Sequence, residues 1–151
     1  AVVTLDADGQ HDPAEIPRLL EAWQRERPEM VVGARDYDDM PLVRRLSNKV
    51  GRRSLSWALG AYIPDNQSGY RVVGERLMRA MLDSGEGGFE FEVWMIVLCV
   101  RHDWPMAWLP IRTIYGEQGS HIRPFEHVKS YYRMMRAIRS ERRTWSAAAG
   151  T

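Results

Sequence analysis

Hydrophobic residues come in short unbroken runs that alternate with stretches at helical spacing, which is typical of an α/β protein. Residues 1–5 form a β-branched run that ends abruptly in the polar segment 6–9, as a buried strand does where it opens into a loop. Asp12 and Pro13 then predict the start of a helix, and a second short strand is predicted at 30–33. The order strand, loop, helix, strand predicts a parallel α/β sheet rather than a helical bundle.

The alternation continues along the chain. It predicts, in order, a helix at 42–59, a brief strand at 70–73, helices at 74–82 and 89–101, strands at 108–111 and 113–115, and a last helix at 125–145. Neither an internal repeat nor a low-complexity segment interrupts these elements, apart from the small residues at 146–151. We therefore expect a single domain over residues 1–145, followed by a short tail.

Composition favours a folded domain over a disordered or membrane-spanning segment. Of the 151 residues, 44% are hydrophobic, which is ordinary for a globular protein. The longest apolar run, residues 93–100, is much shorter than the about 20 residues of a membrane-spanning helix, and predicts a buried helix instead. The single cysteine, Cys99, lies in that run, so we expect a buried structural thiol and no disulfide framework.

The formal net charge of +1 hides an asymmetry between two parts of the chain. Residues 1–40 hold ten acidic and four basic side chains, whereas residues 41–151 hold ten acidic and seventeen basic ones. A basic second part favours an anionic partner, which could be phosphate groups, an anionic bilayer or nucleic acid; the alternative is a solvated surface.

The last predicted helix places an apolar stripe beside several lysine and arginine residues. The stripe consists of Val128, Tyr132, Met135 and Ile138. A basic amphipathic helix of this kind can lie on an anionic bilayer. The alternative is a helix that packs its stripe on the domain and keeps its basic face in water.

The loop after the first strand carries two carboxylates two positions apart, Asp6 and Asp8, which can converge on one small cation. Carboxylate oxygens suit Mg²⁺ or Mn²⁺, which keep bound water and also take phosphate oxygens as ligands. Gln10 adds a third oxygen donor, and Gly9 lets the backbone approach a ligand closely. This composition fits a metal–diphosphate site, and the alternative interpretation is an ordinary Asp/Gly turn.

Two other interpretations of the same loop fit the residues less well. An EF-hand loop starting at Asp6 needs Gly at its sixth position and Glu at its twelfth, where this chain has His11 and Pro17. A haloacid-dehalogenase-type phosphatase also places Asp-x-Asp after a strand, but it is expected to continue with Thr where Gln10 stands. A convincing later Gly-Asp acidic pair for such a phosphatase is also missing from the sequence.

Residues 3–13, Val-Thr-Leu-Asp-Ala-Asp-Gly-Gln-His-Asp-Pro, closely resemble the metal-binding segment of family 2 glycosyltransferases of the dolichyl-phosphate mannosyltransferase and polyprenyl-phosphate glycosyltransferase type. Later stretches resemble the same family in the same order, and together they reach residue 124. They are Val32-Gly33-Ala34-Arg35, Asp65-Asn66-Gln67-Ser68-Gly69-Tyr70-Arg71, Phe89-Glu90-Phe91-Glu92, Arg112-Thr113-Ile114-Tyr115 and Gly119-Ser120-His121.

The resemblance implies a GT-A fold, a Rossmann-like α/β sandwich with the metal loop in its middle. In that family an N-terminal half binds the nucleotide base and ribose, and this sequence lacks it. The first strand here also has no turn or cap before it. We therefore expect residues 1–145 to be the C-terminal two-thirds of one catalytic domain, truncated at its N-terminus, with metal and acceptor residues but without the ability to bind donor alone.

The resemblance also implies an activity. The expected reaction moves a sugar from a GDP- or UDP-linked donor to a polyprenyl or dolichyl phosphate, with Mg²⁺ or Mn²⁺ as cofactor. The expected place is the cytoplasmic face of a membrane, peripherally bound at an anionic surface, with no nucleic acid as partner.

Candidate site residues follow from this chemistry and from the motifs. Asp8 is the first choice for the metal, with Asp6 and Gln10 completing the site. A leaving diphosphate and a phosphate acceptor need cations, because the phosphate nucleophile is already anionic. The candidates are Arg35, Arg44, Arg45, Arg71 and Arg112, of which Arg35, Arg71 and Arg112 lie in the resembling motifs.

Four further residues have candidate roles near the sugar or the phosphates. Asp65 and Glu90 could orient sugar hydroxyls, or serve as general base if the acceptor is a hydroxyl. Ser120 and His121 belong to the phosphate-facing segment, although a solvated loop histidine is equally consistent.

Two alternative functions stay open at this point. A family 2 enzyme could act on a glycan or another hydroxyl acceptor, which would demand a positioned base. In a different class, a non-catalytic module could bind anionic lipid or nucleic acid through its basic helices, and its binding would ignore Mn²⁺ and nucleotide.

Overall fold

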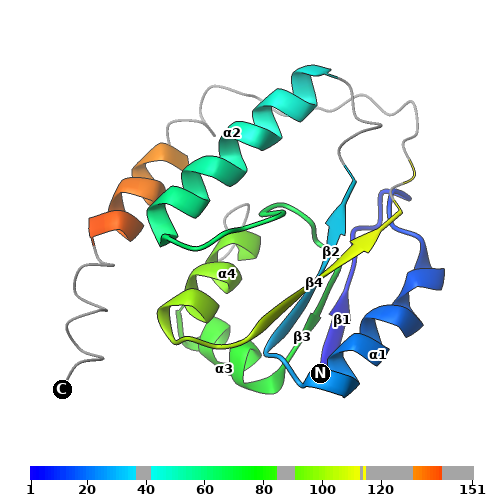
Figure 1. The fold of residues 1–151 in the computed structure, drawn as a ribbon. Helices are drawn as coiled ribbons and strands as arrows, with labels where there is room; N and C mark the ends of the chain where they lie inside the picture. Colours follow the sequence, from blue (N-terminus) through cyan, green and yellow to red (C-terminus); the bar gives the residue numbers. More distant parts are fainter. Residues whose placement is uncertain (37–41, 85–90, 113, 115–130, 141–151) are drawn as a thin grey trace.

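The computed structural model describes residues 1–36, 42–84, 91–112, 114 and 131–140, with backbone only for 42–44 and 84. In chain order the elements are β1 (Val2–Thr4), the 3₁₀ turn η1 (Pro13–Glu15), α1 (Ile16–Glu26), β2 (Met30–Arg35), α2 (Leu42–Leu59), β3 (Arg71–Val73), α3 (Glu75–Ser84), α4 (Phe91–Arg101) and β4 (Met106–Ile111) (Figure 1). Residues 131–140 are also helical. None of the helices in these ranges is both long and apolar enough to cross a membrane.

The four strands form one mixed sheet in the order β1-β3-β2-β4. β2 and β4 are parallel, from Met30 opposite Met106 to Arg35 opposite Ile111. β3 runs antiparallel to both of its neighbours, β1 and β2. The prediction of a parallel sheet is therefore wrong for β3, while the α/β class is confirmed.

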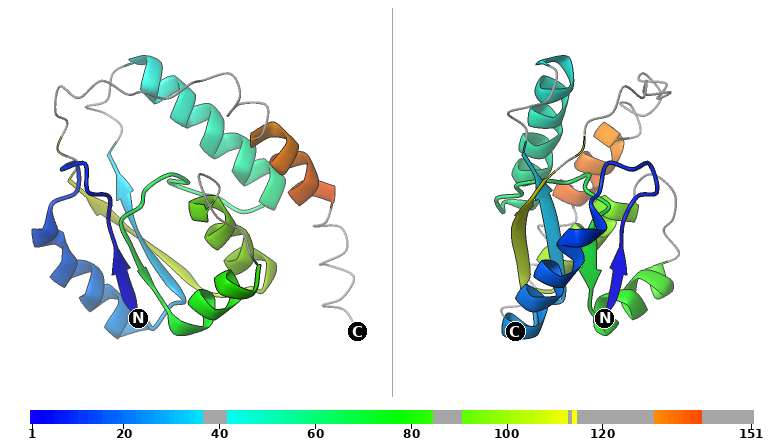
Figure 2. Two further views of the ribbon diagram at one scale, coloured as in Figure 1. Left: turned by 180° about the vertical axis from the view of Figure 1, so that it is seen from behind. Right: turned by 90° about the vertical axis from the view of Figure 1, so that its right-hand side faces the viewer.

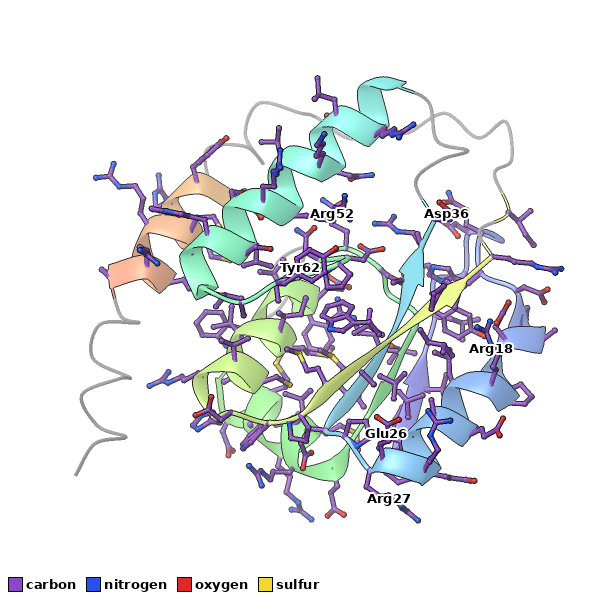
Figure 3. All side chains as sticks on the ribbon, in the orientation of Figure 1. Arg18, Glu26, Arg27, Asp36, Arg52 and Tyr62 are labelled. Carbon is purple, nitrogen blue, oxygen red and sulfur yellow. The ribbon has the colours of Figure 1, made fainter. Side chains whose placement is uncertain are left out.

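The direction of β3 follows from the path of the chain between β2 and β3. A parallel connection would need a helix that crosses the sheet and returns the chain to the opposite edge. Instead, α2 lies beyond the ends of the strands (Figure 1). Residues 60–70 then bring the chain back to the edge that β2 has just left. Arg52 of α2 donates to the Pro64 carbonyl at 2.7 Å and ties the helix to this returning loop (Figure 3).

Helices cover both faces of the sheet (Figure 2). Alternate residues of β2 belong to the two different core clusters on these faces. On one face, α1 packs Leu19 and Ala22 against Val31 and other sheet residues. On the other, Met30 and Val32 join side chains of α2, α3 and α4 in the larger core cluster. The result is a layered α/β arrangement with the core split by the sheet.

α4 is buried on nearly all sides, as its apolar sequence predicts. Val93 and residues 95–99 are buried in it, including Cys99. Burial raises the pKa of the Cys99 thiol to about 12, so this thiol stays protonated. The prediction of a buried, structural cysteine is confirmed.

Local signals located most elements. The helix predicted at 42–59 has those bounds, and Asp12 accepts the N–H of Ala14 at 2.9 Å as the predicted cap. The strand predicted at 30–33 continues to Arg35, and the strand predicted at 108–111 begins at Met106, since the two pair along their full length. Of the strand predicted at 113–115, only residue 114 is described, and it is not in a strand.

The last predicted helix is described over residues 131–140 and lies beside α2 (Figure 2). Tyr131 donates to the Gly51 carbonyl at 2.8 Å. Met135 and Ile138 are buried in the core cluster, whereas Tyr132 is half-exposed. The two buried residues of the predicted stripe therefore pack on the domain rather than face a bilayer. The remaining parts of 125–145 and the tail at 146–151 lie outside the described residues.

Candidate functional site

Four chain segments meet at one edge of the sheet (Figure 1). β1, β2 and β4 end there, and β3 begins there because it runs the other way. Arg71, the first residue of β3, lies between Thr4 of β1 and Val32 of β2. The loop 6–12, the end of β2, the loop 64–70 and Arg112 are thereby brought to the same edge. Asp36, the residue after β2, also lies there (Figure 3).

The loop that follows β1 is a tight turn with its carboxylates in solvent. Asp8 accepts the backbone N–H of Gln10 on its Oδ1 at 2.9 Å, and Gly9 between them has a φ of 77°. Glycine adopts this left-handed backbone conformation without strain, and it is common after an aspartate that caps its own turn. Both Asp6 and Asp8 are exposed, and Gln10 is half-buried.

Beneath the exposed carboxylates, His11 is buried and faces Asp6. Its Nδ1 accepts the backbone N–H of Asp6 at 3.1 Å and lies 3.8 Å from the Asp6 carboxylate. Burial lowers the pKa of His11, although the charges of Asp6 and Asp8 act in the opposite direction. A neutral imidazole suits an acceptor role, since a protonated ring has no acceptor nitrogen.

The ends of this loop are fastened to the rest of the sheet edge. Ile114 donates its backbone N–H to the Gln10 carbonyl at 3.0 Å. Tyr70 is fully buried and donates its hydroxyl to the Asp12 carbonyl at 2.9 Å. These contacts fix the loop from two sides, so its carboxylates are held by residues far away in sequence.

Asp6 also contacts the loop that leads into β3. A Cβ added at Gly69 would lie 2.4 Å from Asp6 Oδ1, which is closer than side-chain carbons approach. Thr4 donates its hydroxyl to the Gly69 carbonyl at 2.8 Å. Gly69 is therefore required for the close approach of this loop to the Asp6 carboxylate.

Arg35, at the end of β2, forms a two-pronged ion pair with Asp65. Its Nε and Nη2 donate to the two carboxylate oxygens at 2.8 and 3.0 Å, and its backbone N–H donates to Oδ2 at 3.2 Å. The Asp65 carboxylate is fully buried and also accepts the N–H groups of Gln67 and Ser68. Burial alone would raise the pKa of Asp65, but the hydrogen bonds and the charge of Arg35 outweigh it and hold the pKa below its usual value.

Arg71 is turned into the core. It is fully buried and donates to the Ser68 carbonyl at 2.8 Å and to the Glu92 carbonyl at 2.6 Å. Burial lowers the pKa of Arg71 to about 10, with Glu92 and Asp65 opposing that effect, so the side chain is charged at neutral pH. Arg71 thus bridges the loop before β3 to the first turn of α4.

Comparison with known proteins agrees with this geometry. A family model for glycosyl transferase family 2 matches residues 1–84, more than half of the chain. The chain belongs to glycosyl transferase family 2. It therefore has the α/β fold of the GT-A type that the resemblance implies, with the mixed sheet described above.

Three relatives align over about three quarters of the chain. An uncharacterised protein of Methanocaldococcus jannaschii is 31% identical over 77% of this chain and 50% of its own length. A UDP-N-acetylglucosamine–dolichyl-phosphate N-acetylglucosaminyltransferase of Methanococcus voltae is 29% identical over 76% of this chain and 48% of its own. An undecaprenyl-phosphate mannosyltransferase of Micrococcus luteus is 32% identical over 78% and 51%. This family 2 chain thus spans about half the length of these relatives.

The remaining candidate residues of this family 2 domain are only partly described. Arg45 near the start of α2 and Arg112 after β4 are exposed to solvent. Four candidates lie outside the described residues or side chains: Arg44, Glu90, Ser120 and His121. The structure therefore brings Asp6, Asp8, Gln10, Arg35 and Arg112 to one edge of the sheet, and places Asp65 and Arg71 beneath it.

The acidic loop offers oxygen donors of the kind that a small divalent cation takes. Within the described part of the chain, no group of three or more histidine, cysteine, aspartate and glutamate side chains could hold a metal ion. Asp6 and Asp8 supply two exposed carboxylates, and only Oδ1 of Asp8 is used by the turn. Together with the Gln10 carboxamide, this donor set fits Mg²⁺ or Mn²⁺ that also keeps water and phosphate oxygens.

Sequence reasoning gave no role to three residues that shape this edge, His11, Gly69 and Tyr70. His11 follows the acidic pair directly, and Gly69-Tyr70 stand inside a motif that the resemblance already covered. The sequence signal that could have identified His11 is the presence of a loop histidine close to an aspartate. The contacts of Gly69 with Asp6 and of Tyr70 with Asp12 join segments about 60 residues apart, so only the fold reveals them.

Proposed function

We propose that this chain is the metal- and acceptor-binding part of a glycosyltransferase that moves a sugar from a nucleoside-diphosphate sugar to a polyprenyl phosphate. The observation that carries the proposal is the pair of exposed carboxylates, Asp6 and Asp8. They lie at the edge of the sheet where β2 ends with Arg35 and where Arg112 follows β4. The names of the relatives from Methanococcus voltae and Micrococcus luteus support the choice of acceptor class.

The donor diphosphate would be bound through the acidic loop. Asp8 would be a direct ligand of Mg²⁺ or Mn²⁺, with Asp6 and Gln10 contributing directly or through water. When bound, such a cation neutralises negative charge on the leaving diphosphate. The contribution of the chain is to hold the two carboxylates in place, which it does through the Asp8 turn and the contacts of Asp6 with His11 and Gly69.

The environment of Asp65 argues against this residue as the general base that a hydroxyl acceptor would need. A hydroxyl needs a general base that can reach it, with a carboxylate free to take a proton. The Asp65 carboxylate is fully buried, and it accepts hydrogen bonds from Arg35, Gln67 and Ser68. We therefore assign Asp65 to positioning Arg35, and a phosphate acceptor needs no base because it is anionic already.

Phosphate groups would be held by arginines at the site edge. Arg35 keeps 16% of its side chain exposed while Asp65 fixes its orientation. Arg45 and Arg112 are both exposed, and Arg112 directly follows the end of β4 at this edge, where a guanidinium can bind phosphate. Arg71, which is buried and bound to two carbonyl groups, serves this site by holding the loop 64–70 rather than by touching a phosphate.

A peripheral position on an anionic membrane is supported by α2 rather than by the last helix. Leu46, Val50 and Trp57 are exposed along α2, at 64%, 48% and 59% of their surface. Lys49 and Arg53 are exposed between them. Apolar side chains interleaved with basic ones suit the interface of a bilayer with anionic lipid.

Calorimetry tests the donor site. GDP- and UDP-sugars would be titrated into the full-length protein with and without Mn²⁺, comparing wild type with Asp8→Ala and with the charge-matched control Glu21→Ala on α1. We expect Mn²⁺-dependent binding of one nucleotide class that Asp8→Ala abolishes and Glu21→Ala retains.

Other outcomes would favour the competing functions. Binding that survives Asp8→Ala, or no binding of either nucleotide, would contradict the metal–diphosphate site. Strong binding of nucleic acid or lipid that falls with salt but ignores Mn²⁺ and nucleotide would favour a non-catalytic basic module. Sugar transfer to a hydroxyl acceptor in place of a polyprenyl phosphate would favour the second type of family 2 enzyme.

A further inference from the structure

His11 is the one buried residue of an otherwise solvent-facing loop. Residues 6–9 are exposed, whereas His11 is 6% exposed. Its Nδ1 accepts the Asp6 N–H at 3.1 Å, which closes a ring of six residues around the Asp8 turn. An acceptor at Nδ1 requires that the proton of the neutral imidazole be on Nε2.

The imidazole is itself held by the start of β3. It packs on the ring of Tyr70, with ring centroids 5.0 Å apart and an angle of 33° between the planes. The Tyr70 hydroxyl donates to the Asp12 carbonyl at 2.9 Å. Tyr70 therefore contacts the ring of His11 and fixes the backbone of the residue that follows it, so the imidazole cannot shift without breaking contacts with the sheet.

Asp6 is thereby fixed at two points. His11 holds its backbone N–H, and Gly69 lies against its carboxylate, where a Cβ would be 2.4 Å from Oδ1. Gly69 and Tyr70 are neighbours in the chain, so the same short segment positions both the carboxylate of Asp6 and the histidine that holds its backbone. Nothing comparable fixes Asp8, whose hydrogen bond in the described structure is local to its own turn.

We propose that His11 is a positioning residue for the donor site: through its Nδ1 it sets the Asp6 backbone so that the Asp6 carboxylate joins Asp8 at a divalent cation bound to a nucleoside diphosphate. This role rests on the proposed function of the acidic loop. The histidine makes no contact with ligand in this role, and it acts through Asp6. Residues that orient metal ligands from behind typically change metal affinity by about 10- to 100-fold when replaced.

Three substitutions at His11 separate the effect of the hydrogen-bond acceptor from the effect of ring packing. His11→Asn places Oδ1 as many bonds from Cα as Nδ1 is, so it keeps the acceptor and loses the ring. His11→Phe keeps a ring to pack on Tyr70 and loses the acceptor. His11→Gln places its acceptor one bond further out. If the hydrogen-bond acceptor determines Mn²⁺ affinity, His11→Asn keeps the affinity that His11→Phe and His11→Gln lose. This holds even though His11→Asn disturbs the packing on Tyr70 most.

The test is Mn²⁺ affinity in the full-length protein at saturating nucleoside diphosphate, measured by calorimetry, with thermal unfolding recorded without metal. We expect His11→Phe and His11→Gln to weaken Mn²⁺ binding by about 10-fold. We expect His11→Asn to stay within about 3-fold of wild type, whatever its unfolding temperature. Equal affinities for wild type and His11→Phe, or a loss in His11→Asn as large as in His11→Phe, would overturn the role of His11.

Failure of the proposed function gives a different result. If wild type binds no Mn²⁺ with nucleoside diphosphate, the donor site itself is wrong and the His11 role falls with it. If the variants do not fold, the imidazole ¹⁵N shifts of the wild-type protein decide. A proton on Nε2 with a bare Nδ1 supports the role, and a proton on Nδ1 overturns it.

Discussion

Asp65 receives both prongs of the Arg35 guanidinium, although the two residues are 30 positions apart in the chain. The contact joins the last residue of β2 to the loop that enters β3, and the Arg35 backbone N–H reinforces it. One fully buried carboxylate thus fixes the orientation of an arginine at the site edge and the shape of the loop that carries Gly69.

Replacing Asp65 is expected to destabilise the fold. Asp65→Asn keeps the size of the side chain but leaves the Arg35 guanidinium without its carboxylate, and breaking a buried ion pair costs about 3 kcal/mol or more. Chemical unfolding with urea measures the free energy. The control is Glu75→Gln, which breaks an exposed pair with Arg79 on α3 and should leave stability unchanged. Equal effects of the two substitutions would contradict the assignment.

The stabilising effect of Asp65 should depend on pH. Burial raises its pKa, but Arg35 outweighs burial, and the net pKa in the folded state is below the usual value of 3.8. The stabilisation is therefore fully present above pH 3.8 and is lost as the pH falls through the lower, folded-state pKa. Unfolding free energies of wild type and Asp65→Asn, measured across this window, should converge as the pH falls. A constant difference would show that the pair does not titrate as described.

Gly69→Ala should impair the donor site more than the fold. The three atoms nearest to the added Cβ all belong to the Asp6 carboxylate, which can rotate away, so we expect stability to change by less than about 1 kcal/mol. Moving a metal ligand should weaken Mn²⁺-dependent nucleotide binding by about 10-fold. Gly51→Ala in α2 is the matched control, because the atom nearest to its Cβ would be Nδ2 of Asn66 at 3.8 Å, an ordinary contact. Unchanged nucleotide binding in Gly69→Ala would argue against Asp6 as a ligand.

Arg71 and Arg112 should behave in opposite ways. Arg71→Ala removes a buried side chain that donates to two carbonyl groups, and we expect a loss of about 3 kcal/mol in unfolding free energy. Arg112→Ala changes an exposed residue, so stability should hold within about 0.5 kcal/mol while diphosphate binding weakens by about 10-fold. Denaturant unfolding and nucleotide titration of both variants distinguish the roles. If Arg71→Ala is as stable as wild type but binds phosphate more weakly, Arg71 contacts the ligand instead of holding the loop.

The exposed face of α2 should mediate membrane binding. Leu46→Ser removes an apolar side chain that is 64% exposed, and sedimentation with phosphatidylcholine vesicles containing phosphatidylglycerol should fall several-fold. Leu82→Ser, on α3, is the control: that leucine is 82% exposed but lies on another helix. Wild-type binding should also weaken in vesicles without phosphatidylglycerol. If both leucine variants lose binding equally, the interaction is not specific to α2.

Local signals were sufficient to predict the helices and the Asp12 cap, since caps and helical spacing act over a few residues. The direction of β3 was predicted wrongly, because it depends on where α2 sends the chain, which no local pattern records. Arg71 was expected at the ligand because it lies in a motif that resembles the family, yet it pairs with Thr4 on one side and Val32 on the other, and its side chain is buried. The Arg35–Asp65 pair and the packing of His11 on Tyr70 could not be predicted either, since both join segments that are distant in the sequence. The metal and phosphate roles stay predictions.

The reversed direction of β3 has a consequence for folding kinetics. Thr4 meets Gly69 across 65 residues and Asp12 meets Tyr70 across 58, so the edge that carries the acidic loop is built from contacts of high sequence separation. Such contacts form only after long loops have closed, which is slow relative to helix formation. Helices α1 and α2 can therefore form while Asp6 and Asp8 are still unsupported. Ligand affinity should recover later during refolding than the helical circular dichroism signal does.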